Sequence, residues 1–246
     1  MPGSFEEKKE PMYVVCDRGA KRSRMQIFSV SGKFIRNIPI TYIDIVSGLC
    51  TTHDRKIVVV DSVRSGVSIL NEFGVLLFWF SCASDMVEPS DINVYNQHYY
   101  ICDFKGHSVN VFNHHGVLIR KIGTPGTKFP NGIDISDMGD ILVGDSHGNR
   151  FHVSLFTSLG QLQGDYECPY LKVSRCCGLK LTSEGLIVTL AKNNNHVLVL
   201  EGICVEKSEE DESNSNLSNG SFWNDMNLLV WTFIIFIINL YIDSVF

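Results

Sequence analysis

Short apolar runs alternate with turn-forming residues along residues 131–160, and this spacing predicts β-strands. The expected elements are a strand at 133–135, a tight turn at 137–140, a strand at 141–143, a loop at 145–152 and a strand at 153–156. Alternating apolar and polar positions support the strands, and the Gly, Asn and Ser content supports the eight-residue loop. Gly160 then begins the turn to a fourth strand. Four antiparallel strands in about 40 residues is the size of one β-propeller blade.

The same unit recurs along the chain, and three kinds of marker residue keep its phase. Turn glycines recur at intervals of 42, 42 and 44 residues: Gly32, Gly74, Gly116 and Gly160. Aspartates that end the second strand recur at intervals of 44, 42 and 42: Asp17, Asp61, Asp103 and Asp145. First-strand glycines are 84 and 46 residues apart, with Ser90 expected at the missing position: Gly48, Gly132 and Gly178. We interpret the aspartates as caps of loop amides in their own blades, not as a catalytic ring.

The repeats predict an incomplete all-β propeller of about four to five blades. Residues 42–82, 86–123 and 129–168 predict complete blades, whereas residues 11–40 lack a first strand and residues 173–200 lack an outer one. Unpaired strand edges expose a row of backbone donors and acceptors. We therefore expect free edges at 12–28 and 186–200, and we expect residues 11–202 expressed alone to aggregate or to need a partner.

Composition points to a near-neutral propeller with an acidic C-terminal part. The 246-residue chain has a formal net charge of −6, and residues 201–246 hold eight acidic residues against the single base Lys207. The remainder therefore carries about +1 (−6 minus −7), so the propeller is not a bulk polyanion binder, although a local basic face stays open.

The eight cysteines show no C-x2-C spacing and predict reduced, buried thiols with no metal or other cofactor. No signal peptide is expected in residues 1–10, which favours a cytoplasmic protein.

The two ends differ from the propeller in composition. The expected organisation is a charged lead-in at 1–10, the propeller at 11–202, an acidic disordered linker at 203–225 and an apolar tail at 226–246. The tail could form a transmembrane helix that anchors the protein through residues 228–246. Its clean apolar run, however, spans only 11 residues, short of the roughly 20 that a membrane helix needs. A marginal anchor and a spurious translated extension both remain open.

Longer stretches of the sequence resemble a known repeat. Two segments, FPNGIDISDMGDILVGDSHGNRFHV and EPSDINVYNQHYYICDFKGHSVNVF, resemble the NHL repeat. Further stretches such as VSRCCGLKLTSEG and VTLAKNNNHVLVL are similar to the propeller of the TRIM-NHL family, most closely its Thin/Abba-like group and more distantly Brat. The resemblance covers residues 12–200.

The resemblance implies a six-bladed NHL-type propeller that binds protein clients or single-stranded RNA. In most members a RING domain and a B-box transfer ubiquitin, and the propeller recognises clients for ubiquitination or RNA for translational repression. This chain departs from the pattern in three ways: no RING or B-box, about one and a half blades fewer, and an apolar tail. We therefore expect a fragment that is a binding module and not itself an enzyme.

One face of the propeller gathers the candidate binding residues. In an antiparallel blade the second-to-third loops and the blade-to-blade crossings lie on the same face, and here they are the longer connections. They carry basic and aromatic residues: Arg22, Arg24, Arg64, Phe104, Lys105, His107, Phe129, His147, Arg150, Tyr170, Lys172 and Arg175. Such a mixture suits single-stranded RNA, whose phosphates meet Lys and Arg while its bases stack on rings. A protein-client surface fits the same residues, and DNA is not expected.

A propeller-type metal-dependent lyase or lactonase is the alternative. His107, His147 and His196 would then surround the central channel. These histidines occupy different positions of the repeat, so symmetry would not bring them to one metal ion.

Overall fold

The computed structural model describes residues 11–18, 22–123, 126–148, 150–172, 176–191, 196–201, 228–231 and 241–245, which contain strands and no helix. From its inner to its outer strand, the first blade consists of β20 (Tyr241–Val245), β1 (Met12–Arg18), β2 (Ser23–Ser29) and β3 (Phe34–Ile38), and the other blades follow in the same inner-to-outer order. The second is β4 (Val46–Thr51), β5 (Ile57–Asp61), β6 (Gly66–Leu70) and β7 (Leu76–Ser81), and the third is β8 (Pro89–Tyr95), β9 (His98–Asp103), β10 (Ser108–Phe112) and β11 (Leu118–Ile122). The fourth is β12 (Pro130–Ile135), β13 (Ile141–His147), β14 (Arg150–Phe156) and β15 (Leu162–Lys172), and the fifth is β16 (Cys176–Leu181), β17 (Leu186–Ala191), β18 (His196–Glu201) and β19 (Leu228–Trp231).

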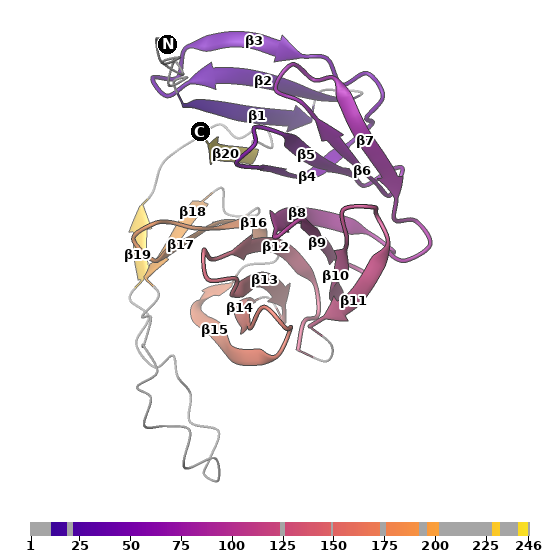
Figure 1. Ribbon diagram of the computed structural model, residues 1–246. Coiled ribbons are helices and arrows are strands. Elements are labelled where there is room, and N and C mark those ends of the chain that lie inside the picture. Colours follow the sequence, from indigo (N-terminus) through magenta and orange to yellow (C-terminus); the bar gives the residue numbers. More distant parts are fainter. Residues whose placement is uncertain are drawn as a thin grey trace, which may run out of the picture.

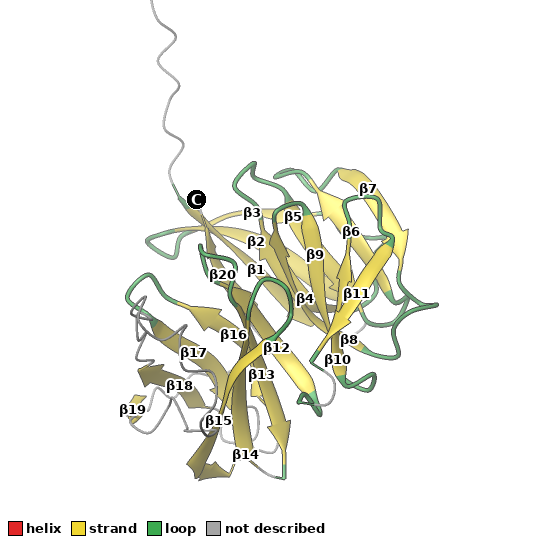
Figure 2. Ribbon diagram, turned by 60° about the horizontal axis from the view of Figure 1, so that its bottom comes forward, coloured by secondary structure: helices red, strands yellow, loops and turns green. Residues whose placement is uncertain are grey.

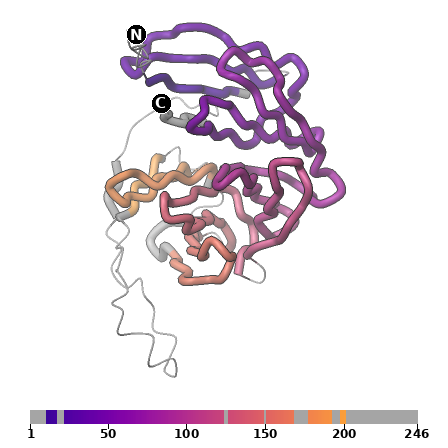
Figure 3. Tube along the Cα trace, viewed as in Figure 1, coloured from indigo at the N-terminus to yellow at the C-terminus, as the bar shows by residue number. Residues whose placement is uncertain are grey.

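These five antiparallel sheets are the blades of a β-propeller (Figure 1). Their inner strands lie beside one another in the order β20, β4, β8, β12 and β16 (Figure 2). The chain passes through the blades in sequence, as the colours of the trace show (Figure 3). The predicted all-β propeller is therefore confirmed.

At two of the blade junctions the inner strands approach each other closely enough to require glycine. A Cβ atom on Gly48 would lie 2.6 Å from the Cα atom of Asp91, and one on Gly132 would lie 2.6 Å from the backbone carbon of Gly178. No real Cβ contact is that short, so a larger side chain there would push two blades apart. This close packing is the reason why the first-strand glycines recur in the sequence.

The register corrects one assignment at this junction. Asp91 pairs with Cys102 as Gly48 pairs with Val60, so Asp91, and not Ser90, occupies the glycine position of the third blade. Ser90 instead donates its hydroxyl hydrogen to the carbonyl oxygen of Pro130 at 2.9 Å, a bond between neighbouring blades. The same irregularity occurs in β4 and β12, so the offset of one residue comes from the turn: four residues separate the paired Val94 and Tyr99, whereas five separate the equivalent Thr51 and Ile57.

The turns between strands confirm the recurring turn glycines that the sequence predicted. Gly32, Gly74, Gly116 and Gly160 have φ angles of 80°, 86°, 76° and 87°, in the left-handed region that glycine tolerates. In each turn the glycine N–H donates to the carbonyl three residues earlier, as in the bond from Gly74 to Asn71 at 3.0 Å. The sequence pattern therefore located these turns correctly.

The core consists of apolar side chains sandwiched between blades, and several cysteines belong to it. Cys16, Cys50, Cys82 and Cys102 are reduced and buried, which confirms the predicted thiols at these positions. Burial raises the pKa values of the Cys16 and Cys82 thiols to about 12, so both stay protonated at neutral pH.

The described part of the tail is β-structure, so the predicted apolar helix is wrong for these residues. β20 pairs with β1, from Met12 opposite Val245 to Cys16 opposite Tyr241. β19 pairs with β18, from Val197 opposite Trp231 to Leu200 opposite Leu228. The first strand that the first blade was expected to lack is thus supplied by the C-terminal segment, and the predicted free edges at 12–28 and 186–200 are paired. None of the described residues belongs to a helix that could span a membrane.

The predicted lead-in at 1–10 and the linker at 203–225 lie outside the described residues.

Candidate partner-binding face

Buried aspartates organise the loops on the predicted binding face. The carboxylate of Asp61 accepts the N–H groups of Asp44 and Val63, each at 2.9 Å. That of Asp103 accepts the N–H groups of Val87, Glu88 and Gly106 at 2.9, 2.8 and 2.9 Å. Each carboxylate thus binds both its own loop and the crossing that precedes its blade. The capping role predicted for these aspartates is confirmed and extends to the crossing.

Asp17, in the first blade, has a different partner. Arg24 donates to it with two guanidinium nitrogens, at 3.0 and 2.7 Å. The inner strand of this blade is β20, and the segment that leads into β20 lies outside the described residues. Arg24 is thus the partner of a structural carboxylate.

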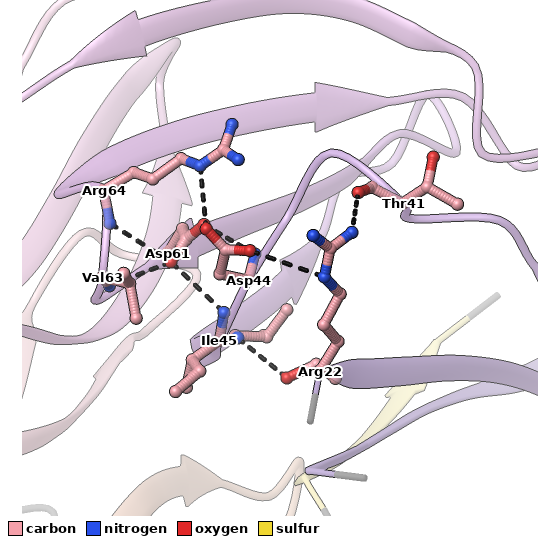
Figure 4. Close-up of polar contacts among 9 residues, drawn as sticks. Arg22, Thr41, Asp44, Ile45, Asp61, Val63 and Arg64 are labelled. Carbon is pink, nitrogen blue, oxygen red and sulfur yellow. Dashed lines mark hydrogen bonds and ion pairs between the residues drawn. The ribbon is translucent and has the colours of Figure 1, made fainter. Parts of the chain in front are cut away.

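Two further arginines of the candidate set converge on one carboxylate. Figure 4 shows Arg22 and Arg64 pointing toward Asp44 from opposite sides, next to Asp61. The Nε atom of Arg64 lies 2.9 Å from Asp44, and the Nε atom of Arg22 lies 3.7 Å from it. Arg22 also donates to the carbonyl oxygen of Thr41 at 2.8 Å. Asp44, in the crossing between the first two blades, partly neutralises both cations.

The remaining described cations of the set also have carboxylate partners. The Nζ atom of Lys105 lies 2.8 Å from Glu88, and Arg150 forms an ion pair with Glu167. Arg22, Arg24, Arg64, Lys105 and Arg150 therefore all face carboxylates. Among the side chains that the structure describes, the basic residues of this face are thus interleaved with acidic ones.

An aromatic cluster stands at the junction of the third and fourth blades. The ring centroids of Phe104 and Phe129 are 5.3 Å apart, and His107 meets Phe129 edge-on at 5.2 Å. Phe129 remains 36% exposed, and His107 is also exposed. We call Phe104, His107 and Phe129 the aromatic platform.

Backbone contacts hold the aromatic platform in place. The hydroxyl of Thr127 donates to the carbonyl oxygen of His107 at 2.7 Å, and a ring nitrogen of His107 contacts the carbonyl of Lys128. The N–H of Phe129 donates to Asp145 at 2.8 Å. His107 has a φ angle of 56°, and Ser65, at the equivalent position of the second blade, has one of 46°, so this left-handed conformation belongs to the turn of the repeat. The platform is therefore preorganised.

A stacked histidine pair lies on β13 and β14, where a loop was predicted. The two strands pair through residues 145–152, with Asp145 opposite His152 and His147 opposite Arg150. The rings of His147 and His152 are parallel within 8° and 3.8 Å apart, and Nδ1 of His147 lies 3.0 Å from Asp145. The predicted loop at 145–152 is therefore wrong, since the strands extend almost to the turn.

We expect this pair to make stability depend on pH. Burial, and then the neighbouring His147, lower the pKa of His152, although Asp165 and Asp145 oppose the shift. The unfolded chain then binds the proton more readily, so stability falls as pH drops below about 6.5, the ordinary pKa of histidine. Urea unfolding at pH 7.5 and 5.5 should show a smaller loss for His152→Phe than for wild type. Equal losses would contradict the assignment.

For three candidate residues, the structure describes no side chain. The backbones of Tyr170 and Lys172 belong to β15, with Lys172 opposite Arg150, while their side chains and all of Arg175 lie outside the described residues. Their predicted roles in binding remain predictions.

Sequence reasoning missed a polar row along the inner strands. Asn93 on β8 donates to Asp134 on β12 at 2.5 Å, and Lys180 on β16 lies 3.3 Å from the same carboxylate. The other oxygen of Asp134 accepts the N–H of Leu181 at 2.6 Å. The separations of 41 and 46 residues match the repeat and were the available signal. These contacts join three successive blades.

Two of the three histidines of the lyase alternative, His107 and His147, have separate partners. His107 contacts Lys128, His147 contacts Asp145 and His152, and the side chain of His196 is not among those described. Within the described part of the chain, no group of three or more His, Cys, Asp or Glu residues could hold a metal ion.

Comparisons with known proteins place the chain by fold. No protein-family model and no curated protein matches the sequence. Among solved structures, one of a nidogen/laminin complex aligns with a TM-score of 0.63 at 12% identity, covering 77% of this chain and 73% of that one. A protein of unknown function from Bacteroides caccae aligns with a TM-score of 0.55 at 13% identity, covering 84% and 76%. A streptogramin B lyase aligns with a TM-score of 0.52 at 18% identity, covering 63% of this chain and 51% of the lyase.

These likenesses show a shared propeller fold. The chain spans about half the length of the lyase that it matches. At such identities one fold supports unrelated functions, so the fold alone does not identify the function of this chain.

Proposed function

We propose that this chain is a recognition module of the TRIM-NHL type and that its loop face binds a protein client. The aromatic platform carries the proposal, since His107 and Phe129 are exposed and are held in place by backbone contacts, and Phe104 packs on Phe129. Preorganised aromatic side chains are the usual energetic centres of protein interfaces, because little conformational entropy is lost when they are buried. The platform is flanked by ion-paired residues such as Lys105 and Glu88, which suit the polar rim of an interface.

Charge favours a protein client over single-stranded RNA. RNA binding gains most of its affinity when Lys and Arg side chains neutralise phosphates and release counterions. Here Arg22 and Arg64 already face Asp44, and Lys105 faces Glu88. A phosphate at these positions would meet a carboxylate as well as a cation, which reduces the gain. In this proposal the propeller supplies recognition without a cofactor, in the cytoplasm, and any ubiquitin transfer belongs to other domains.

Alanine substitutions in the platform test the proposal. Proteins retained on the immobilised full chain should be depleted when Phe104→Ala or Phe129→Ala replaces wild type, but not with Phe34→Ala, an exposed phenylalanine on β3. For one purified client, loss of an aromatic anchor should weaken binding by about 2 kcal/mol, roughly 30-fold in Kd. The melting temperatures of the alanine variants must match that of wild type, because Phe129 also packs on its neighbours.

A measurement of RNA binding distinguishes a protein client from single-stranded RNA as the partner. Fluorescence anisotropy with a labelled single-stranded oligonucleotide pool should show weak binding that arginine substitutions barely change. If wild type binds tightly, with a steep salt dependence that Arg22→Ala and Arg64→Ala reduce, the protein-client proposal is wrong and RNA is the partner.

A further inference from the structure

The outer strand of the second blade, β7, is exposed and almost entirely apolar. Leu76, Leu77, Phe78 and Trp79 keep 42%, 50%, 38% and 48% of their surfaces exposed, and β7 is a terminal strand of its sheet. Residues 73–84 contain no charged side chain. An apolar, uncharged edge strand is a template for pairing with another strand, and proteins usually protect such edges with charges.

In the repeat, β7 differs from the outer strands of the first, third and fourth blades, whereas β19 of the fifth blade is also uncharged, with Leu229 and Val230 at the positions equivalent to Phe78 and Trp79. Phe78 lies opposite Ile69, the position that Arg36 holds in β3 and Arg120 holds in β11. Both arginines reach the next blade, Arg36 to the carbonyl of Glu72 and Arg120 to the carbonyl of Ser158, each at 2.5 Å. The second blade has a phenylalanine where two other blades have a cation.

Trp79, the residue after Phe78, also differs from its equivalents in these blades. Trp79 lies opposite Ser68, and the equivalent outer-strand residues of the first, third and fourth blades are polar or charged: Asn37, Lys121 and Asp165. Trp79 packs its ring on Gly66, where a Cβ atom would lie 2.8 Å from the indole nitrogen. The ring is thus positioned on the sheet while about half of it remains exposed.

We propose that β7 is a self-association edge at which two copies of this chain pair antiparallel about a two-fold axis. The occupant must be a strand that brings no charge to the apolar edge, and β7 itself meets that condition. Antiparallel pairing of identical strands places the same patch on both partners and closes after two copies. It would join two four-stranded blades into one continuous sheet.

The available surface is sufficient for such a pair. Phe73 and Val75 are also exposed, at 59% and 56%. With about 150–250 Å² for a large aromatic side chain and less for an aliphatic one, the six residues leave roughly 500 Å² of apolar surface per copy. Two copies would bury on the order of 1,000 Å², the lower limit for a specific interface, in addition to new backbone hydrogen bonds.

The repeat also supplies variants that should fold. Phe78→Arg with Trp79→Lys gives β7 the residues that β11 carries at the equivalent positions, 120 and 121. The matched control is Ile119→Lys on β11, which is 50% exposed like its counterpart Leu77. The full-length chain would be measured by light scattering and sedimentation from about 1 to 100 µM.

Wild type and Ile119→Lys should reach twice the monomer mass as concentration rises. The Phe78→Arg/Trp79→Lys variant should remain a monomer, with its dimer dissociation constant raised at least tenfold and its melting temperature preserved. A wild type that stays monomeric at 100 µM would overturn the proposal, and so would a variant that dimerises as wild type does. Assemblies of wild type larger than two copies would equally exclude the closed pair.

Discussion

Deleting residues 226–246 should convert the protein from a discrete soluble species into aggregates. The deletion removes β19 and β20, which cover the outer edge of β18 and the inner edge of β1. Five residue pairs join β20 to β1, and at about 1 kcal/mol for each backbone hydrogen bond the loss of β20 alone costs roughly 4–5 kcal/mol. That is a large part of the stability of a typical domain, and two newly exposed edges then promote association.

Size-exclusion chromatography with light scattering, together with urea unfolding, measures this effect. A shorter deletion of residues 240–246 removes β20 and leaves β19, so it separates the two edges. Co-expression of residues 226–246 on a soluble carrier should restore part of the lost solubility. If the truncated protein is monodisperse and melts at the temperature of the full chain, the tail strands do not contribute to the fold.

Replacing Asp103 with alanine should be the most damaging single substitution on the loop face. Its carboxylate accepts three backbone N–H groups from both sides of a blade junction and is almost completely buried. Alanine would leave these donors without an acceptor, and hydrogen bonds to a charged group contribute about 1.5–3 kcal/mol each. We expect a loss of about 4–6 kcal/mol in urea unfolding, together with loss of partner binding, since the loop carrying Phe104 and His107 begins at this residue.

Asp54→Ala is the matched control. Asp54 forms an exposed ion pair with Lys56 at 2.7 Å in a turn of the second blade, so its loss should cost less than about 1 kcal/mol. Comparable losses for the two substitutions would show that Asp103 is not a structural centre of the junction.

The sequence predicted the blades well because their markers serve local geometry. Gly74 recurs where a turn needs a positive φ angle, and Asp61 recurs where the amide of its own loop at Val63 needs an acceptor. Such requirements act within a few residues of a marker and repeat in every blade, so spacing alone reveals them.

The features that the sequence did not reveal depend on contacts between residues that are distant in the sequence or on strand pairing. The ion pair of Arg64 with Asp44 spans 20 residues of the sequence, and it neutralises part of a surface that was predicted to be basic. The stacking of His147 on His152 was missed because polar residues in that segment suggested a loop. The apolar tail has the composition of a membrane segment, and only its pairing with β1 and β18 identifies strands.

The position of β20 has a consequence for synthesis on the ribosome. Most contacts between blades join residues about one repeat apart, such as Asn93 and Asp134 at 41 residues, so each blade can settle on the one made before it. The partner of Cys16 is Tyr241, 225 residues later. At roughly 5–20 residues per second, the free edge of β1 waits on the order of 10–45 s for its strand to be translated. Throughout that interval the nascent first blade needs protection, which makes it the expected contact of any chaperone that attends this chain.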